Sequence, residues 1–293
     1  MSICIRALND QFAAEVSGID IAKALCGDEV AAIEAGMNTY GVLVFRDQDI
    51  TDVQQKVFSA HFGPLLDGAN STVKRADLRL DPAFADVSNI DKDGSLLGAD
   101  DRRRISSLGN RLWHSDASFR VVPARFSLLS ARVVPPHGGN TEFADMRAAY
   151  DALDATTKAQ IEDLVCEHSQ IFSRAQLGFT DYLPAERETM TPVLQRLVRI
   201  HPGSGRKSLF LSAHIGSIVG WRVPEALAFI RDLAEHATQR KFVHAHSWRS
   251  GDLVIWDNRC TMHRARSYDD LTYRRDLRRT TTLAEGPTIE QPA

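Results

Sequence analysis

Cysteine is scarce in this sequence, and the cysteines present are far apart. They form no C-x-x-C pair and no dense cluster, the four residues being Cys4, Cys26, Cys166 and Cys260. A disulfide framework of the kind that stabilises small secreted domains is therefore excluded. The pattern indicates a reducing compartment, and we expect a cytoplasmic protein.

Long apolar runs and a surplus of one charge are also missing. No run approaches the length of about 18 apolar residues that suggests a membrane helix, so no membrane span is expected. Met1–Arg6 lacks a basic region followed by a long apolar stretch, and we expect no signal peptide. The net charge of -3 gives no electrostatic reason to expect nucleic acid as a partner, because such proteins carry a basic domain or stripe.

The length and the succession of short apolar runs indicate the fold class. At 293 residues the chain could form two domains, but β barrels and sandwiches of this size are often one, and we expect a single domain over 1–293. Short strand-like runs and turns are interrupted by helical segments, which favours a mainly β jelly-roll or cupin-like barrel with α insertions. We expect helices beginning near 28, 51, 145, 156 and 224, and strands over 42–45, 126–134, 140–143, 194–200, 208–211, 242–246, 253–256 and 279–283.

The segment 67–110 is the most irregular part of the chain. It mixes charges, polar residues and glycine with one expected strand near 85–90, and its charged run 100–104 is expected to be a solvated loop. Long irregular segments in compact domains are usually either functional lids or disordered. Because this one runs directly into a candidate metal-binding motif, we predict a lid over an active site.

That motif is Leu112–Asp116, in which a histidine and an aspartate stand two residues apart. If the segment is a strand, His114 and Asp116 point to the same face. His263, far downstream, is the best third ligand, and two histidines with one carboxylate form the facial triad of non-haem Fe(II) oxygenases. A lone H-x-D arises often by chance, and His244 and His246 share a strand face as a rival pair, although no carboxylate lies in phase with them.

An arginine cluster follows His263 and is suited to binding an anionic ligand beside the metal. Iron held by one carboxylate favours a chelating 2-oxo acid, whose distal carboxylate needs a guanidinium. In a strand, Arg275 and Arg279 share one face, while Arg274 and Arg278 share the other. A solvated, charged edge strand is the simpler alternative. A zinc hydrolase or a non-catalytic jelly roll that binds a sugar or an anion also remains open at this point.

Four motifs in order along nearly the whole chain resemble the TauD/TfdA family of Fe(II)- and 2-oxoglutarate-dependent dioxygenases. They are Trp113–Asp116, the run from Gly138 to Tyr150, the run from Trp256 to Arg264, and Arg275 to Thr281. Within the family, His201–Lys207 and Asp257–Arg264 are similar to the 2,4-dichlorophenoxyacetate dioxygenase branch. The resemblance implies a double-stranded β-helix that uses Fe(II), 2-oxoglutarate and O2.

The resemblance also implies roles for individual residues. The iron ligands would be His114, Asp116 and His263; the 2-oxoglutarate contacts Thr141, Arg275 and Asn110; and the substrate contacts Arg279 and His214. The segment 267–273 is one residue longer than the family spacing, so counting from the last histidine selects Arg274 and Arg278 instead. We favour Arg275 and Arg279, because a loop absorbs an extra residue more easily than a strand absorbs a shift of register.

The function implied is hydroxylation of a small anionic substrate. An aryloxyalkanoate of the 2,4-dichlorophenoxyacetate type, attacked at its ether carbon, would give a phenol and glyoxylate together with succinate and CO2. A taurine-like sulfonate or a sulfate ester is the alternative within the family. Family habit also suggests a homo-oligomer.

Overall fold

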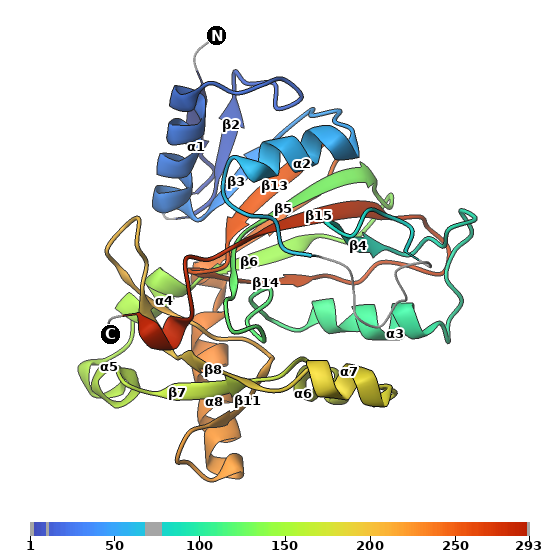
Figure 1. The fold of residues 1–293 in the computed structure, drawn as a ribbon. Coiled ribbons are helices and arrows are strands. Elements are labelled where there is room, and N and C mark those ends of the chain that lie inside the picture. The colour runs from blue at the N-terminus through green and yellow to red at the C-terminus, as the bar shows by residue number, and fades with distance from the viewer. Residues whose placement is uncertain (1–2, 10–11, 68–77, 292–293) are drawn as a thin grey trace.

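The computed structural model describes residues 3–9, 12–67 and 78–291. Its largest sheet has the strand order β1-β2-β3-β13-β5-β15-β4, and all neighbours are antiparallel except β2 and β3. The strands are β1 (Cys4–Ala7), β2 (Ala14–Ser17), β3 (Val42–Phe45), β13 (Leu253–Asp257), β5 (Ala124–Val133), β15 (Asp276–Leu283) and β4 (Ala85–Ser88). Figure 1 shows this sheet twisting through the upper half of the molecule.

A second, smaller sheet lies beneath the first and completes the sandwich (Figure 1). It has the order β12-β6-β14, with the strands β12 (Val243–His246), β6 (Thr141–Asp145) and β14 (Thr261–Ala265). Two more small sheets are made of β11 (Ile215–Ile218), β7 (Val165–His168) and β8 (Val193–Arg196), and of β10 (Lys207–Leu209) and β9 (Val198–Ile200). The predicted mainly β jelly-roll fold with helical insertions is confirmed.

Alternation along the central strands explains why the two sheets stack. In β3, Val42 and Val44 face the inside of the sandwich, where they pack in one cluster with Phe143 of β6. Leu43 and Phe45 face the opposite way, toward α1 (Gly27–Tyr40) and α2 (Asp52–Ala60). Both faces of this sheet are therefore covered, as the continuous apolar run suggests.

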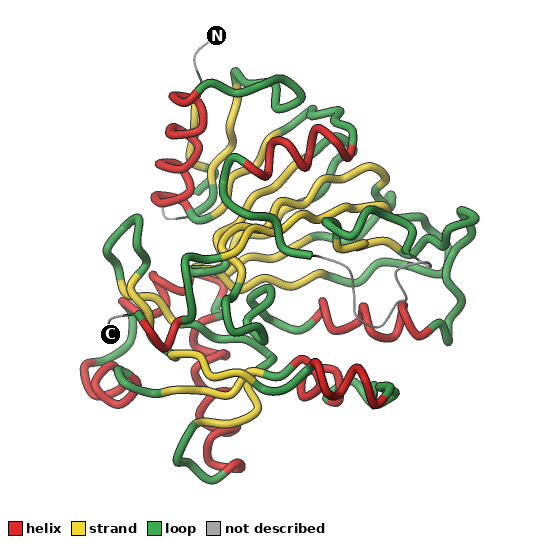
Figure 2. Tube along the Cα trace, in the orientation of Figure 1, coloured by secondary structure: helices red, strands yellow, loops and turns green. Residues whose placement is uncertain are grey.

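The remaining helices surround the sheets, as Figure 2 shows. Those described are α3 (Arg102–Ser107), α4 (Met146–Asp151), α5 (Ala155–Ile161), α6 (Gln170–Ala175), α7 (Pro184–Thr189), α8 (Val223–Ala237) and the 3₁₀ turns η2 (Leu108–Arg111), η3 (Arg240–Phe242) and η4 (Thr288–Glu290). The outer face of the small sheet, with Ala144 and Met262, packs in one cluster with residues of α4 and α8. No helix in the described parts of the chain is long and apolar enough to cross a membrane.

Three local expectations were wrong. The segment around His114 is no strand: this residue makes a single antiparallel bridge to His263, and Asp116 lies in the turn that follows. Strand β14 was not expected, because its short sequence carries histidine and arginine. The run 100–104 is no solvated loop either, since Arg102 and Arg103 lie in α3 and form ion pairs with acidic side chains.

Candidate active site

The three predicted metal ligands meet at one end of the sandwich. The backbones of His114 and His263 are joined by two N–H to O bonds of 3.0 and 2.8 Å. Nε2 of His114 lies 3.7 Å from Oδ1 of Asp116, and Nε2 of His263 lies 3.6 Å from Oδ2 of the same carboxylate. All three side chains are buried, and their possible ligand atoms lie within 4.8 Å of one another. Two imidazoles and one carboxylate in this arrangement fit a divalent first-row metal.

Neighbouring groups fix the orientation of these ligands. Nδ1 of His114 lies 2.7 Å from the carbonyl oxygen of Leu112, which places the proton on Nδ1 and leaves Nε2 free to bind a metal. The hydroxyl of Ser127 donates to Oδ2 of Asp116 at 2.7 Å, and the backbone N–H of Asp116 donates to the Asn258 side chain at 3.0 Å. Both histidine and carboxylate are thus held before any metal arrives.

The electrostatics of the site favour the metal-binding protonation states. Burial lowers the pKa of both His114 and His263, so both imidazoles are neutral at neutral pH. Burial alone would raise the pKa of Asp116, but the guanidinium of Arg279 and the two histidines outweigh it and hold this pKa below its ordinary value. The carboxylate is therefore ionised.

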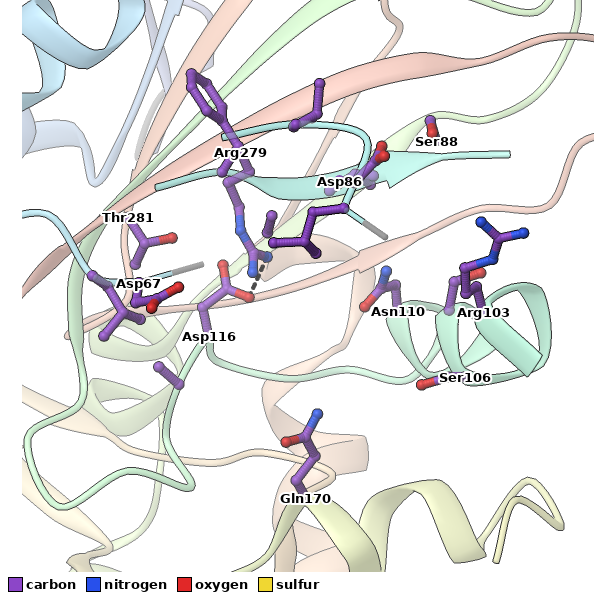
Figure 3. Close-up of a pocket in the computed structure, with 18 of the residues that line it drawn as sticks. Asp67, Asp86, Ser88, Arg103, Ser106, Asn110, Asp116, Gln170, Arg279 and Thr281 are labelled. Carbon is purple, nitrogen blue, oxygen red and sulfur yellow. Dashed lines mark hydrogen bonds and ion pairs between the residues drawn. The ribbon is translucent and has the colours of Figure 1, made fainter. Parts of the chain in front are cut away.

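Arg279 reaches this carboxylate from β15. Its Nη1 donates to Oδ1 of Asp116, as the dashed line in Figure 3 shows. In the same strand Leu277 packs inside the sandwich, and alternation places Arg275 and Arg279 on the inner side with it. Arg278 instead pairs with Asp276 and with Asp52 of α2, on the outer side.

Arg275 is a buried cation without a carboxylate partner among the described residues. It is 5% exposed; its guanidinium donates long hydrogen bonds to the carbonyl oxygens of Val87 and Gly139, at 3.4 and 3.5 Å, and lies 5.8 Å from the ring centroid of Tyr268. Burial lowers its pKa to about 10, so the group remains charged at neutral pH. A buried unpaired charge is costly, and this one fits the carboxylate of a ligand.

Thr141 and Asn110 lie on either side of this region. Thr141 pairs with Ala265 in β14, two residues beyond the pairing of Phe143 with His263, and therefore lies on the same sheet face as that metal ligand. Its hydroxyl accepts a hydrogen bond from Trp248 at 3.0 Å. Asn110 lines both a small cavity of about 60 Å³ beside Arg275 and the larger cavity next to the metal ligands.

The larger cavity, of about 210 Å³, is lined by both apolar and charged side chains (Figure 3). Its apolar lining includes Leu66, Leu78, Leu80, Phe84, Val87, Ile90, Leu97 and Phe119. His114, Asp116 and Arg279 lie at the metal end. His214 also lines it, and its ring lies 4.8 Å from that of Phe119. Such a cavity fits a ligand with an apolar body and an anionic head.

The family-model comparison decides the relationship of this chain. The model described as "Taurine catabolism dioxygenase TauD, TfdA family" matches residues 5–281. The chain belongs to the TauD/TfdA family. This confirms the predicted class of enzyme, a 2-oxoglutarate-dependent non-haem iron dioxygenase, and the cofactors of that class: Fe(II), 2-oxoglutarate and O2.

Individual TauD/TfdA relatives cover almost the whole chain. It is 48% identical to the alpha-ketoglutarate-dependent 2,4-dichlorophenoxyacetate dioxygenase of Cupriavidus pinatubonensis, over 98% of this chain and 99% of that one. It is 35% identical to the (S)-phenoxypropionate/alpha-ketoglutarate-dioxygenase of Delftia acidovorans, over 87% of each. The crystal structure of AAD-2 with Mn(II) and N-oxalylglycine superposes with a TM-score of 0.91 at 55% identity, covering 99% of this chain and 100% of that one.

The structure bears on two alternatives left open by the sequence, the choice of arginines and the rival histidine pair. Arg274 is exposed and Arg278 is occupied by acidic groups outside the sandwich, so the geometry favours Arg275 and Arg279 for the TauD/TfdA roles. The rival pair His244 and His246 forms no three-ligand cluster among the described residues. A carboxylate from beyond this strand does lie beside it: Nε2 of His246 is 3.1 Å from Oδ2 of Asp252.

A second group of possible ligands, His201, Asp257 and Cys260, is better explained as part of an ion network. The carboxylate of Asp257 lies 2.9 Å from Nε2 of His201 and accepts a bond of 2.8 Å from Arg259. Because the oxygens of the Asp257 carboxylate are occupied by these partners, this group of residues has a structural role.

Sequence reasoning missed two kinds of residue at this TauD/TfdA site. Ser127 of β5 and Asn258 of the turn after β13 support Asp116, and only the position of Asn258 within a quoted motif hinted at a role. Arg174, at the end of α6, lines the larger cavity although nothing in its local sequence marks it.

Proposed function

We propose that this enzyme hydroxylates the ether carbon of a small aryloxyalkanoate anion. The observation that carries the proposal is the composition of the larger cavity, whose lining combines His114 and Asp116 with apolar side chains and the guanidinium of Arg279. An aryl ring suits the apolar side chains, and a carboxylate suits the arginine. The names of the two curated relatives support the same substrate class.

The cosubstrate would be held by residues of this chain on the other side of the metal ligands. His114, Asp116 and His263 would bind Fe(II), and Arg275 would pair with the distal carboxylate of 2-oxoglutarate. Its burial and its lack of an acidic partner support this role. Thr141 would contribute its hydroxyl to the same carboxylate.

The remaining role of the protein is to position the substrate. When bound, Fe(II), 2-oxoglutarate and O2 supply the oxidising equivalents, and 2-oxoglutarate is converted to succinate and CO2. Arg279 would hold the substrate carboxylate beside Asp116, which places the adjacent ether carbon, rather than the ring, next to the metal. Hydroxylation there gives a hemiacetal, which for an aryloxyacetate collapses to a phenol and glyoxylate.

We also propose that the segment 67–110 acts as a lid over the active site, from the part of it that the structure describes. Of the segment 67–110, residues 68–77 lie outside the described part of the chain. In the remainder, Phe84 to Ser88, Leu97 and Asn110 line the cavity, which supports a covering role.

A single domain over 1–293, a homo-oligomer and a cytoplasmic location are likewise our proposals. The cytoplasmic location is supported by the scattered cysteines, all four of which are free.

The test is a panel assay with Fe(II) and 2-oxoglutarate. Succinate and phenol release would be measured with aryloxyalkanoates, alkyl sulfonates and sulfate esters. We expect the aryloxyalkanoates to give the highest kcat/KM and a phenol for each succinate. A preference for a sulfonate or a sulfate ester would overturn the substrate assignment. Metal-dependent hydrolysis without O2 consumption would instead indicate a zinc hydrolase.

A further inference from the structure

Arg174 is a buried guanidinium in the wall of the larger cavity. The residue is 9% exposed, lines the cavity together with His114 and Asp116, and has no carboxylate partner among the described residues. Its Nε has no hydrogen-bond partner, and Nη1 has only a long contact of 3.5 Å with the hydroxyl of Ser173. A buried cation with so few partners fits a ligand anion.

The neighbours of Arg174 connect it to a predicted substrate contact. The hydroxyl of Ser173 also lies 2.8 Å from Nδ1 of His214, whose ring faces that of His114 at a centroid distance of 6.1 Å. Burial, and then the charge of Arg174, hold the pKa of His214 well below its ordinary value. His214 is therefore neutral, and within this trio of residues only the arginine supplies charge.

The charges around the metal ligands do not balance without a second anion. The described lining of the cavity carries five arginines (Arg79, Arg103, Arg120, Arg174 and Arg279) against three aspartates (Asp67, Asp86 and Asp116), and Asp116 is already bonded to Arg279. Burial first, and then repulsion by Arg279, lower the pKa of Arg174. A divalent metal adds further positive charge.

The backbone leaves room for this guanidinium. Gly109 of η2 packs against it so closely that a Cβ at that position would lie 2.2 Å from Cζ of Arg174. Because the flexible end of the arginine would have to move, any side chain at position 109 would displace the guanidinium. The position of Arg174 therefore depends on a glycine one residue before Asn110.

We propose that Arg174 is a second binding residue for the anionic head of the primary substrate, acting with Arg279 at the metal end of the cavity. Arg279 is committed in part to Asp116, whereas Arg174 has its charge free for the ligand. This inference rests on the proposed function for the identity of the anion. It also predicts that the enzyme discriminates strongly between charged and uncharged aryl ethers.

The test is an anaerobic calorimetric titration of 2,4-dichlorophenoxyacetate, and of its uncharged amide, into Mn(II)- and 2-oxoglutarate-loaded protein. We expect Arg174→Gln to weaken binding of the acid by about 10- to 100-fold, because a charge-assisted hydrogen bond in a buried site is lost. Binding of the amide should change little. Arg174→Lys should recover part of the loss, and Gly109→Ala should weaken binding of the acid without removing the arginine.

The control is Arg187→Gln, which alters an exposed arginine of the neighbouring helix α7. Acid affinity of Arg174→Gln within about twofold of wild type would overturn the inference. So would a loss confined to 2-oxoglutarate affinity, which would assign Arg174 to the cosubstrate. The wild-type titration tests the proposed function separately: if wild type binds a sulfonate or a sulfate ester instead, the same comparison with that anion still decides the role of Arg174.

Discussion

The hydroxyl of Ser127 donates a 2.7 Å hydrogen bond to Oδ2 of Asp116, and the same hydroxyl accepts one of 3.0 Å from the side-chain amide of Asn258. That amide's oxygen accepts the backbone N–H of Asp116. The candidate metal ligand Asp116 is thus held at its carboxylate by a residue of β5 and at its backbone by a residue of the turn after β13. Its orientation does not depend on the metal.

Removing this support should weaken metal binding. We expect Ser127→Ala to lower the Fe(II) affinity by roughly 10-fold, since partners of ligating groups typically contribute 10- to 100-fold to metal affinity. The affinity would be measured by metal titration under anaerobic conditions.

Ser130→Ala provides a matched control for that substitution. Ser130 lies in the same strand and is equally buried, but its hydroxyl has no hydrogen-bond partner. An equal loss of Fe(II) affinity in both variants would show that the Ser127 effect comes from general disturbance of β5.

The arginine pair before β15 distinguishes the two possible registers. Arg275→Gln should raise the KM for 2-oxoglutarate by about 100-fold, because removing one partner of a buried charge pair costs about 2–5 kcal/mol. Arg274→Gln, which alters the exposed neighbour, should leave it unchanged. Steady-state kinetics with 2-oxoglutarate as the varied substrate would decide, and the reverse result would mean that the register assignment is wrong.

A buried histidine in β7 predicts how stability depends on pH. His168 stacks on Phe210, neither ring nitrogen has a hydrogen-bond partner among the residues that the structure describes, and burial lowers its pKa to about 3 from 6.5. The unfolded chain therefore takes up a proton that the folded chain does not. The contribution of His168 to stability is complete above pH 6.5 and is lost as the pH falls toward 3.

Replacing this histidine should make the pH dependence shallower. We expect the free energy of unfolding of His168→Leu to fall less steeply between about pH 6 and pH 4, by up to about 1.4 kcal/mol per pH unit. Denaturant unfolding at several pH values would measure the slope, with a substitution of the exposed His61 as control. An unchanged slope would show that His168 is protonated in the folded enzyme.

Local patterns predicted which candidate metal ligands the fold brings together, although one premise behind the prediction was wrong. His114 and Asp116 were expected on one face of a strand, whereas the structure brings them together through a single bridge and a turn in which Ala117 has a φ of 51°. The two-residue spacing was enough for the prediction, because the expected strand and the observed bridge and turn both place the two side chains on the same side.

Residues whose role depends on distant packing could not be predicted. Arg174 becomes a cavity residue because Gly109, some 65 positions earlier by numbering, leaves space for its guanidinium. Similarly, the carboxylate beside His246 comes from Asp252, in the turn before β13, and no period-two pattern predicts that contact. Such features require the fold itself.

The most direct test of the central claim is the stoichiometry of a single reaction with an aryloxyacetate. Phenol and succinate would be quantified together in wild type and in Asp116→Ala, each with added Fe(II). We expect wild type to release equal amounts of both products only when Fe(II), 2-oxoglutarate and O2 are all supplied, and Asp116→Ala to release neither. Phenol release without matching succinate, or equal turnover by the variant, would contradict the account.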